Sequence, residues 1–180
     1  MKWQSVLGLL TCVFGLSIGA HAQATPTASK AGNLQLGVGG VLVSTDYVPA
    51  KTKGLTVYGD FDFTRHIGIE GDIHFGSIIT PGDLGEDSYL LGPRYVINHK
   101  RFSGYGKLLV GIGRLNYQQG FFPSNASFTY KIYAFGGGLD IKATRRLNIR
   151  AIDVELQKWP GYRNGLSPIV TTVGVAYSFP

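Results

Sequence analysis

The chain has 180 residues and a formal net charge of +6, with 26 glycines, 10 tyrosines, 10 phenylalanines and a single cysteine, Cys12. This length fits one domain, glycine with aromatic residues favours β structure, and one cysteine excludes an internal disulfide framework. The basic residues are spread through the chain rather than gathered on one face or helix, so we expect no nucleic-acid partner.

The N-terminus has the pattern of a secretory signal peptide. Lys2 is followed by an uncharged apolar stretch from Val6 to Ile18, and then by Ala20-His21-Ala22, where a signal peptidase would cut. The apolar stretch is shorter than the ~20 residues that a spanning helix needs, and no later stretch is continuously apolar. We therefore predict a signal peptide over residues 1–22, which includes Cys12, and a flexible leader over residues 23–32.

From residue 33 onward the dominant pattern is a hydrophobic alternation of period two, which indicates β-strands. Apolar and polar side chains alternate most regularly from Leu55 to Phe63 and again from Ile67 to Phe75. Only Thr64, Arg65 and His66 separate these two segments, so we expect a tight hairpin.

The same pattern predicts eight strands, at residues 34–44, 55–63, 67–75, 88–97, 102–113, 130–141, 147–157 and 169–179. The seventh strand changes phase, and a β-bulge near Ala151–Asp153 would restore one consistent face. Residues 77–87 and 114–129 are predicted to be loops. The expected fold is all-β, an eight-stranded antiparallel up-and-down transmembrane β-barrel over residues 33–180.

The connections also alternate in length, which favours a bacterial outer-membrane barrel. Segments 48–54, 77–87, 114–129 and 158–167 are mostly longer, and segments 64–66, 98–101 and 142–146 are short. Short periplasmic turns and longer outer loops are typical of such barrels, so we expect both termini in the periplasm.

A soluble β-sandwich could also carry strands with one polar and one apolar face. Two features favour the membrane barrel. The apolar faces carry aromatic residues near the strand ends, as membrane-interface girdles do, and the polar faces are rich in glycine and small residues that suit a narrow lumen.

Loose sequence motifs carry a family resemblance over most of the chain. The C-terminal run 172–179 has Gly174 followed by Tyr177 and Phe179 in alternation, and the other motifs are Leu-Leu-Gly-Pro-Arg-Tyr at 90–95, Lys-Leu-Leu-Val-Gly at 107–111 and Gly-Gly-Gly-Leu-Asp at 136–140. Together they resemble the OmpA-like family of small, porin-like outer-membrane β-barrel proteins. The resemblance implies a C-terminal insertion signal at Gly174, Tyr177 and Phe179 that the barrel-assembly machinery reads. It also implies a monomer among outer-membrane lipids, and we expect no periplasmic peptidoglycan-binding domain.

The parity of the strands places a set of charged side chains in the lumen: Asp60, Asp62, Glu70, Asp72, Arg94, Lys107, Asp140, Arg150, Asp153 and Glu155. Buried charges are costly unless they are paired, so we expect the three bases to bridge several of the acids. The favoured interpretation is a packed lumen in a barrel with a structural or membrane-integrity role. The alternative is a narrow gated pore for small solutes or ions.

Two further functions have some support in the sequence. A lipid-modifying hydrolase would need a serine, a histidine and an acid together, and the candidates His74, Ser77 and Asp72 are too weak a signal, so we expect no enzyme, metal or cofactor. Surface adhesion is a further alternative, because aromatic residues mark the predicted outer loops: Tyr117, Phe121, Phe122, Trp159 and Tyr162. Trp159 and Tyr162 could equally form an interfacial belt or pack over the barrel mouth.

Overall fold

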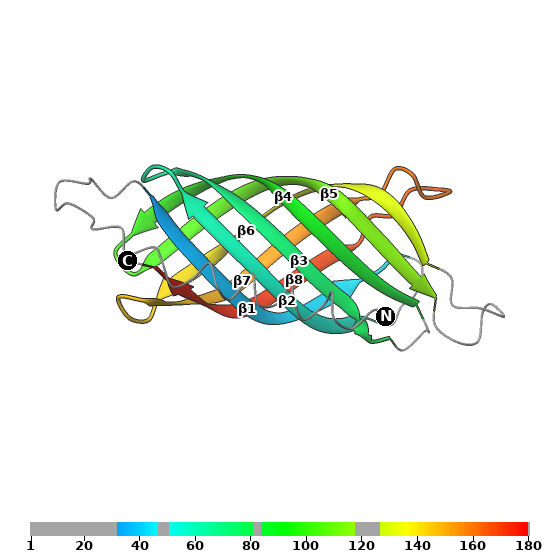
Figure 1. Ribbon diagram of the computed structural model, residues 1–180, viewed down its shortest axis with the longest axis horizontal. Coiled ribbons are helices and arrows are strands. Elements are labelled where there is room, and N and C mark those ends of the chain that lie inside the picture. Colours follow the sequence, from blue (N-terminus) through cyan, green and yellow to red (C-terminus); the bar gives the residue numbers. More distant parts are fainter. Residues whose placement is uncertain (1–31, 47–50, 81–83, 118–126, 180) are drawn as a thin grey trace, which may run out of the picture. The chain divides into compact units, whose positions relative to one another are not determined.

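The computed structural model describes residues 32–46, 51–80, 84–117 and 127–179. These residues form eight strands: β1 (Asn33–Ser44), β2 (Thr52–Asp62), β3 (Ile67–Ile79), β4 (Leu84–His99), β5 (Phe102–Tyr117), β6 (Ser127–Lys142), β7 (Leu147–Lys158) and β8 (Ile169–Ser178). Each strand pairs antiparallel with the next, and β1 pairs with β8, so the sheet closes into a barrel (Figure 1). The predicted fold is confirmed. None of the described residues forms a helix suited to crossing a membrane.

The two ends of the barrel differ in their connections. Segments 63–66, 100–101 and 143–146 join strands at one end, where the last strand also finishes, and we call it the short-turn end (Figure 1). Segments 45–51, 80–83, 118–126 and 159–168 join strands at the other end, the long-loop end. The predicted alternation of short and long connections therefore holds for most of them, and segment 80–83 is the exception because it is short.

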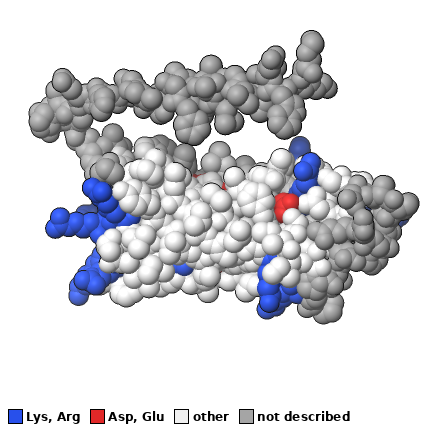
Figure 2. Space-filling model, turned by 60° about the horizontal axis from the view of Figure 1, so that its bottom comes forward, with Lys and Arg blue, Asp and Glu red and all other residues white. Residues whose placement is uncertain are grey.

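The outer surface of the barrel is apolar between its ends. Leu91, Leu108 and Val110 expose 58%, 64% and 58% of their surface, and the residues between them along each strand turn inward. Lys and Arg side chains gather toward the two ends and leave a largely uncharged band between them (Figure 2). A closed sheet with such a band satisfies every backbone group without water, as the membrane interior requires.

A β-bulge in β7 corrects the phase of that strand, as predicted. Arg150 lies opposite Gly174 and Asp153 lies opposite Thr172, so three steps on β7 match two steps on β8. The extra residue, at Ala151, lets Arg150 and Asp153 both point into the lumen, where each is buried.

Deleting Ala151 is therefore expected to leave the barrel intact. The deletion removes the bulge but keeps Arg150 and Asp153 on the inner face, whereas deleting Val154 would turn Glu155 toward lipid and Leu156 toward the lumen. We expect the first variant, but not the second, to keep the shift in electrophoretic mobility on boiling that marks a closed barrel. Loss of that shift in both variants would contradict the assigned role of the bulge.

The predicted loops at residues 77–87 and 114–129 were too long. Strands β3 to β6 run further at the long-loop end, where Leu84 pairs with Tyr117 and Asn116 pairs with Ser127. The added run Arg114-Leu115-Asn116-Tyr117 does alternate, but apolar Leu115 turns inward and basic Arg114 turns outward, the reverse of the apolar outer face by which the strands were predicted. Backbone pairing with the neighbouring strand extends the ladder there.

Candidate functional site

The charged side chains of the barrel gather in its interior, toward the short-turn end. Six consecutive strands, β2 to β7, supply the predicted acids and bases close to that end. Nine of the ten are buried and Asp62 is half-buried; the ten are Asp60, Asp62, Glu70, Asp72, Arg94, Lys107, Asp140, Arg150, Asp153 and Glu155. All ten take part in one connected set of ion pairs, which we call the lumen network.

Lys107 is the most heavily engaged base of the lumen network. Its Nζ atom lies 2.7 Å from Asp72, 2.7 Å from Glu155, 2.9 Å from Asp153 and 3.0 Å from Glu70. An ammonium group has three protons, so these four carboxylates share three hydrogen bonds and the charge of one cation. Lys107 thus joins acids from β3 and β7 across the lumen.

Glu70 is the acid of the lumen network that binds all three bases. Its Oε1 atom accepts hydrogen bonds from Lys107 (3.0 Å) and Arg150 (2.8 Å), and its Oε2 atom accepts one from Arg94 (3.1 Å). The two arginines also meet at Asp60, with Nη–Oδ2 distances of 2.6 Å from Arg94 and 3.2 Å from Arg150. The three bases are therefore held together by carboxylates that would otherwise repel one another.

Two tyrosines complete the lumen network, and strand periodicity alone does not predict a role for them. The guanidinium carbon of Arg150 lies 3.8 Å from the centroid of the Tyr58 ring, and that of Arg94 lies 4.5 Å from the Tyr105 ring. The Tyr105 hydroxyl donates a 2.5 Å hydrogen bond to Asp153. These rings fill the space between the charges and exclude water from it.

A glycine makes the room for one of these rings. Gly37 lies opposite Tyr58 in the register of β1 and β2, and a Cβ atom on Gly37 would stand 2.2 Å from the ring. An aromatic residue on a polar strand face, with glycines on the neighbouring strand, is thus the signal that could have predicted this contact. Tyr105 has the same signal, since its paired residue on β6 is Gly138.

Three further residues lie close enough to suggest a metal site. One ligand atom from each of Asp72, His74 and Glu155 falls within 4.8 Å of the others. However, the Lys107 ammonium already bridges both of these carboxylates, while His74 contacts Glu155 (3.2 Å) and Thr56 (2.9 Å). The charge that a metal ion would bring is supplied by the lysine, so the donor set does not fit a resident metal.

The candidate hydrolase residues do not form a catalytic group. His74 points into the lumen. Ser77 lies three positions further along β3, and because side chains alternate along a strand, it lies on the other face. Ser77 instead donates a 2.5 Å hydrogen bond to Asp87. A serine activated by histidine needs the two side chains within hydrogen-bond reach, and these two lie on opposite faces of the sheet.

Toward the long-loop end the lumen is filled by an apolar cluster, which we call the mouth cluster. Its buried members are Leu90, Leu109, Leu115, Ile132, Ala134, Trp159 and Leu166. Trp159 is only 1% exposed, and its Nε1–H donates a 3.1 Å hydrogen bond to Gln157. A Cβ atom on Gly113 would stand 2.3 Å from the Trp159 ring, so this glycine makes room for the indole.

This placement decides between the interpretations of Trp159 that the sequence leaves open: the side chain is buried at the barrel mouth and is not an exposed loop contact. Trp159 and Leu166 form a β-bridge at the base of segment 159–168, and both side chains are buried in the mouth cluster. Tyr117 and Tyr162 are partly buried against the mouth cluster. Phe121 and Phe122 lie outside the described residues.

The remaining predicted residues belong to the last strand. Gly174 is half-buried beside Tyr58, whereas Tyr177 and Phe179 are exposed on the outer face, 40% and 39% respectively. Their rings contact each other edge to face, with centroids 5.0 Å apart. This arrangement presents two aromatic side chains at the short-turn end of the barrel surface.

Comparison with known proteins agrees with this architecture. Residues 8–179 match the family described as "Outer membrane protein beta-barrel domain". The chain belongs to this family. A comparison with curated proteins finds no match.

Solved structures of other outer-membrane barrels share the fold of this family member. It resembles Ail, the attachment invasion locus protein of Yersinia pestis, at 20% identity and a TM-score of 0.54, covering 82% of this chain and 99% of Ail. It also resembles Neisserial surface protein A (12% identity, TM-score 0.61, 83% and 97% covered). A third match is the outer membrane protein OprG from Pseudomonas aeruginosa, at 14% identity and a TM-score of 0.55, covering 83% of this chain and 96% of OprG. At these identities the likeness extends to the fold, and the protein is an outer-membrane β-barrel.

Proposed function

We propose that this barrel has a structural, membrane-integrity role and that its lumen is closed to solutes. The observation that supports this proposal most strongly is the lumen network, in which Glu70 alone accepts hydrogen bonds from all three buried bases. The mouth cluster then fills the other half of the interior with apolar side chains. An eight-stranded barrel has little interior space beyond its own side chains, and here both halves are occupied.

We also propose that the chain is exported and that the barrel has a fixed orientation in the outer membrane. A signal peptide is removed after Ala22, and the short-turn end with both termini faces the periplasm. The barrel-assembly machinery reads the final strand through Gly174, Tyr177 and Phe179, and the product is a monomer surrounded by outer-membrane lipids. The exposed position of Tyr177 and Phe179 is consistent with such a reading.

Bilayer conductance tests the closed lumen. The purified barrel, shown to be folded by its mobility shift on boiling, is expected to give no stable current steps in a planar lipid bilayer. An established porin inserted in the same bilayer serves as the positive control. Steady current from the folded barrel would overturn the closed-lumen proposal.

A narrow pore for cations is the second candidate, and one observation favours it. The lumen network contains seven acids and three bases, so its formal charge is negative. Mobile cations entering the lumen would offset that charge and would be selected over anions. A steady current that reverses at the potential expected for cations would support this candidate in place of the first.

A further inference from the structure

Three basic side chains lie on the outer face of neighbouring strands near the long-loop end. Arg114 on β5, Lys131 on β6 and Lys158 on β7 are all exposed, and each follows the parity of the outward-facing residues of its strand. Lys131 lies opposite Ile112, two residues from Arg114, and Lys158 lies opposite Tyr133, two residues from Lys131. The three form a row across three strands, which we call the outer basic cluster.

In the part of the chain that the structure describes, the acids nearest the outer basic cluster, Asp87 and Asp46, accept hydrogen bonds from other groups. Asp87 lies opposite Arg114, but its carboxylate accepts hydrogen bonds from Ser77 (2.5 Å) and Asn116 (2.7 Å). Within residues 32–46, 51–80, 84–117 and 127–179, no ion pair involves the three bases. Lys158 donates one hydrogen bond, to the neutral hydroxyl of Ser167. The cluster therefore offers positive charge to an external anion.

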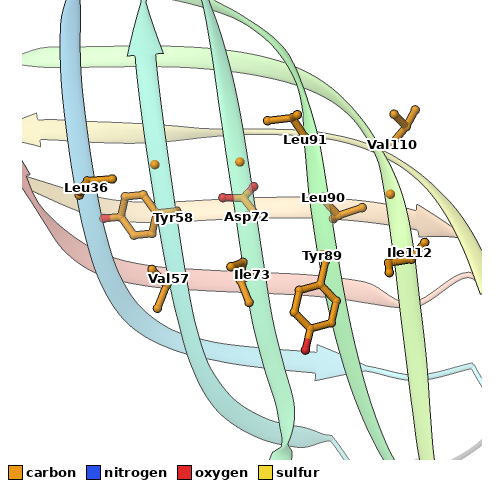
Figure 3. Close-up of a pocket in the computed structure, with 13 residues that line it drawn as sticks. Leu36, Val57, Tyr58, Asp72, Ile73, Tyr89, Leu90, Leu91, Val110 and Ile112 are labelled. Atoms are coloured by element: carbon orange, nitrogen blue, oxygen red, sulfur yellow. The ribbon is translucent and has the colours of Figure 1, made fainter. Parts of the chain in front are cut away.

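An apolar groove adjoins this cluster on the outer face. Gly59 on β2 and Gly71 on β3 lie opposite each other and leave the centre of the groove without side chains. Strands β1 to β5 supply its lining, which includes Leu91 and Ile112 (Figure 3). Ile112 lines the groove and is the outward-facing residue next to Arg114 on β5, and it lies opposite Lys131 on β6. The groove therefore reaches the outer basic cluster.

The charge and the groove together define the occupant. The outer face of a membrane barrel meets lipid, whose acyl chains would fill an apolar groove and whose headgroup would lie at the rim. Each base lies one strand (about 4.8 Å) and two residues along the strand (about 6.8 Å) from the next, so the three bases spread over roughly 16 Å, more than one phosphate can span. We propose that this surface binds a membrane lipid whose headgroup carries two phosphates, with an acyl chain in the groove.

Native mass spectrometry of the whole refolded barrel in detergent, with diphosphoryl lipid A added, tests the proposal. We expect one tightly bound lipid, and about 100-fold weaker binding to the triple variant Arg114→Gln/Lys131→Gln/Lys158→Gln, from three lost headgroup contacts. The matched control replaces three exposed bases of the short-turn end, Arg65→Gln/Arg101→Gln/Arg145→Gln, and should bind as the parent does. Equal loss in both triple variants would overturn the proposal, because binding would then follow net charge.

The groove is tested separately, without any change of charge. A Cβ atom on Gly71 would stand 3.4 Å from a Leu91 methyl carbon, so Gly71→Leu fills the groove with ordinary contacts. We expect weaker lipid binding in this variant. Gly104→Leu, placed in open space elsewhere on the outer face, is the control that should leave binding unchanged. Both variants should keep the mobility shift on boiling.

The number of phosphates is tested with monophosphoryl lipid A. We expect it to bind the parent barrel more weakly than the diphosphoryl form, since one end of the cluster then lacks a partner. Equal affinity for the two lipids, or full affinity in Gly71→Leu, would overturn the assignment of a two-phosphate lipid seated in the groove.

Discussion

Replacing Lys107 with methionine is expected to lower the free energy of unfolding by about 3–5 kcal/mol, among the largest losses that a single substitution can cause here. Methionine is one atom shorter than lysine, so it keeps most of the side chain but removes its charge. Four carboxylates that now lie within 3.0 Å of Nζ would face one another with one base fewer. In a buried site that repulsion is weakly screened.

Urea unfolding in detergent micelles, followed by circular dichroism and by the mobility shift, measures this loss. Lys53→Met is the matched control, because Lys53 is exposed, and its unfolding midpoint should change little. The triple variant Lys107→Met/Asp72→Asn/Glu155→Gln removes two of the opposing charges and should regain much of the stability. Equal midpoints for Lys107→Met and the parent would show that the network contributes nothing to stability.

Period-two alternation was enough to predict which side chains enter the lumen. Asp60 and Glu70 were assigned inward from the parity of their strands, and both are fully buried. The phase change in the seventh strand also predicted a bulge near Ala151–Asp153, and the extra residue is Ala151, which keeps Arg150 and Asp153 on one face. Parity is a local property of each strand, and a single sequence contains it.

The partners across the lumen could not be predicted in the same way. Arg150 and Glu70 are 80 positions apart in sequence, and their contact depends on the stagger of every strand pair between them. The sequence left the burial of Trp159 open for the same reason, because its loop is polar and rich in turn residues and Gly113, which makes room for the ring, lies on a distant strand. Local patterns do not report contacts that barrel closure creates.

The mouth cluster is expected to stabilise the barrel without being needed to seal it. Trp159→Ala removes the largest side chain of that cluster, and such a truncation costs about 3–5 kcal/mol when the cavity does not collapse. The lumen network lies in series with the mouth cluster and is untouched by this change. We therefore expect lower stability in urea but no current in planar bilayers.

Two comparisons make this prediction decisive. Tyr133→Ala, which truncates an outer-face aromatic that is 54% exposed, should cost less stability than Trp159→Ala. Combining Trp159→Ala with Lys107→Met/Asp72→Asn/Glu155→Gln weakens both halves of the interior. If only this combined variant conducts, each half of the interior is sufficient by itself to block the lumen. A steady current from Trp159→Ala alone would mean that ions already pass between the paired charges of the lumen network, and that the apolar mouth is the only barrier.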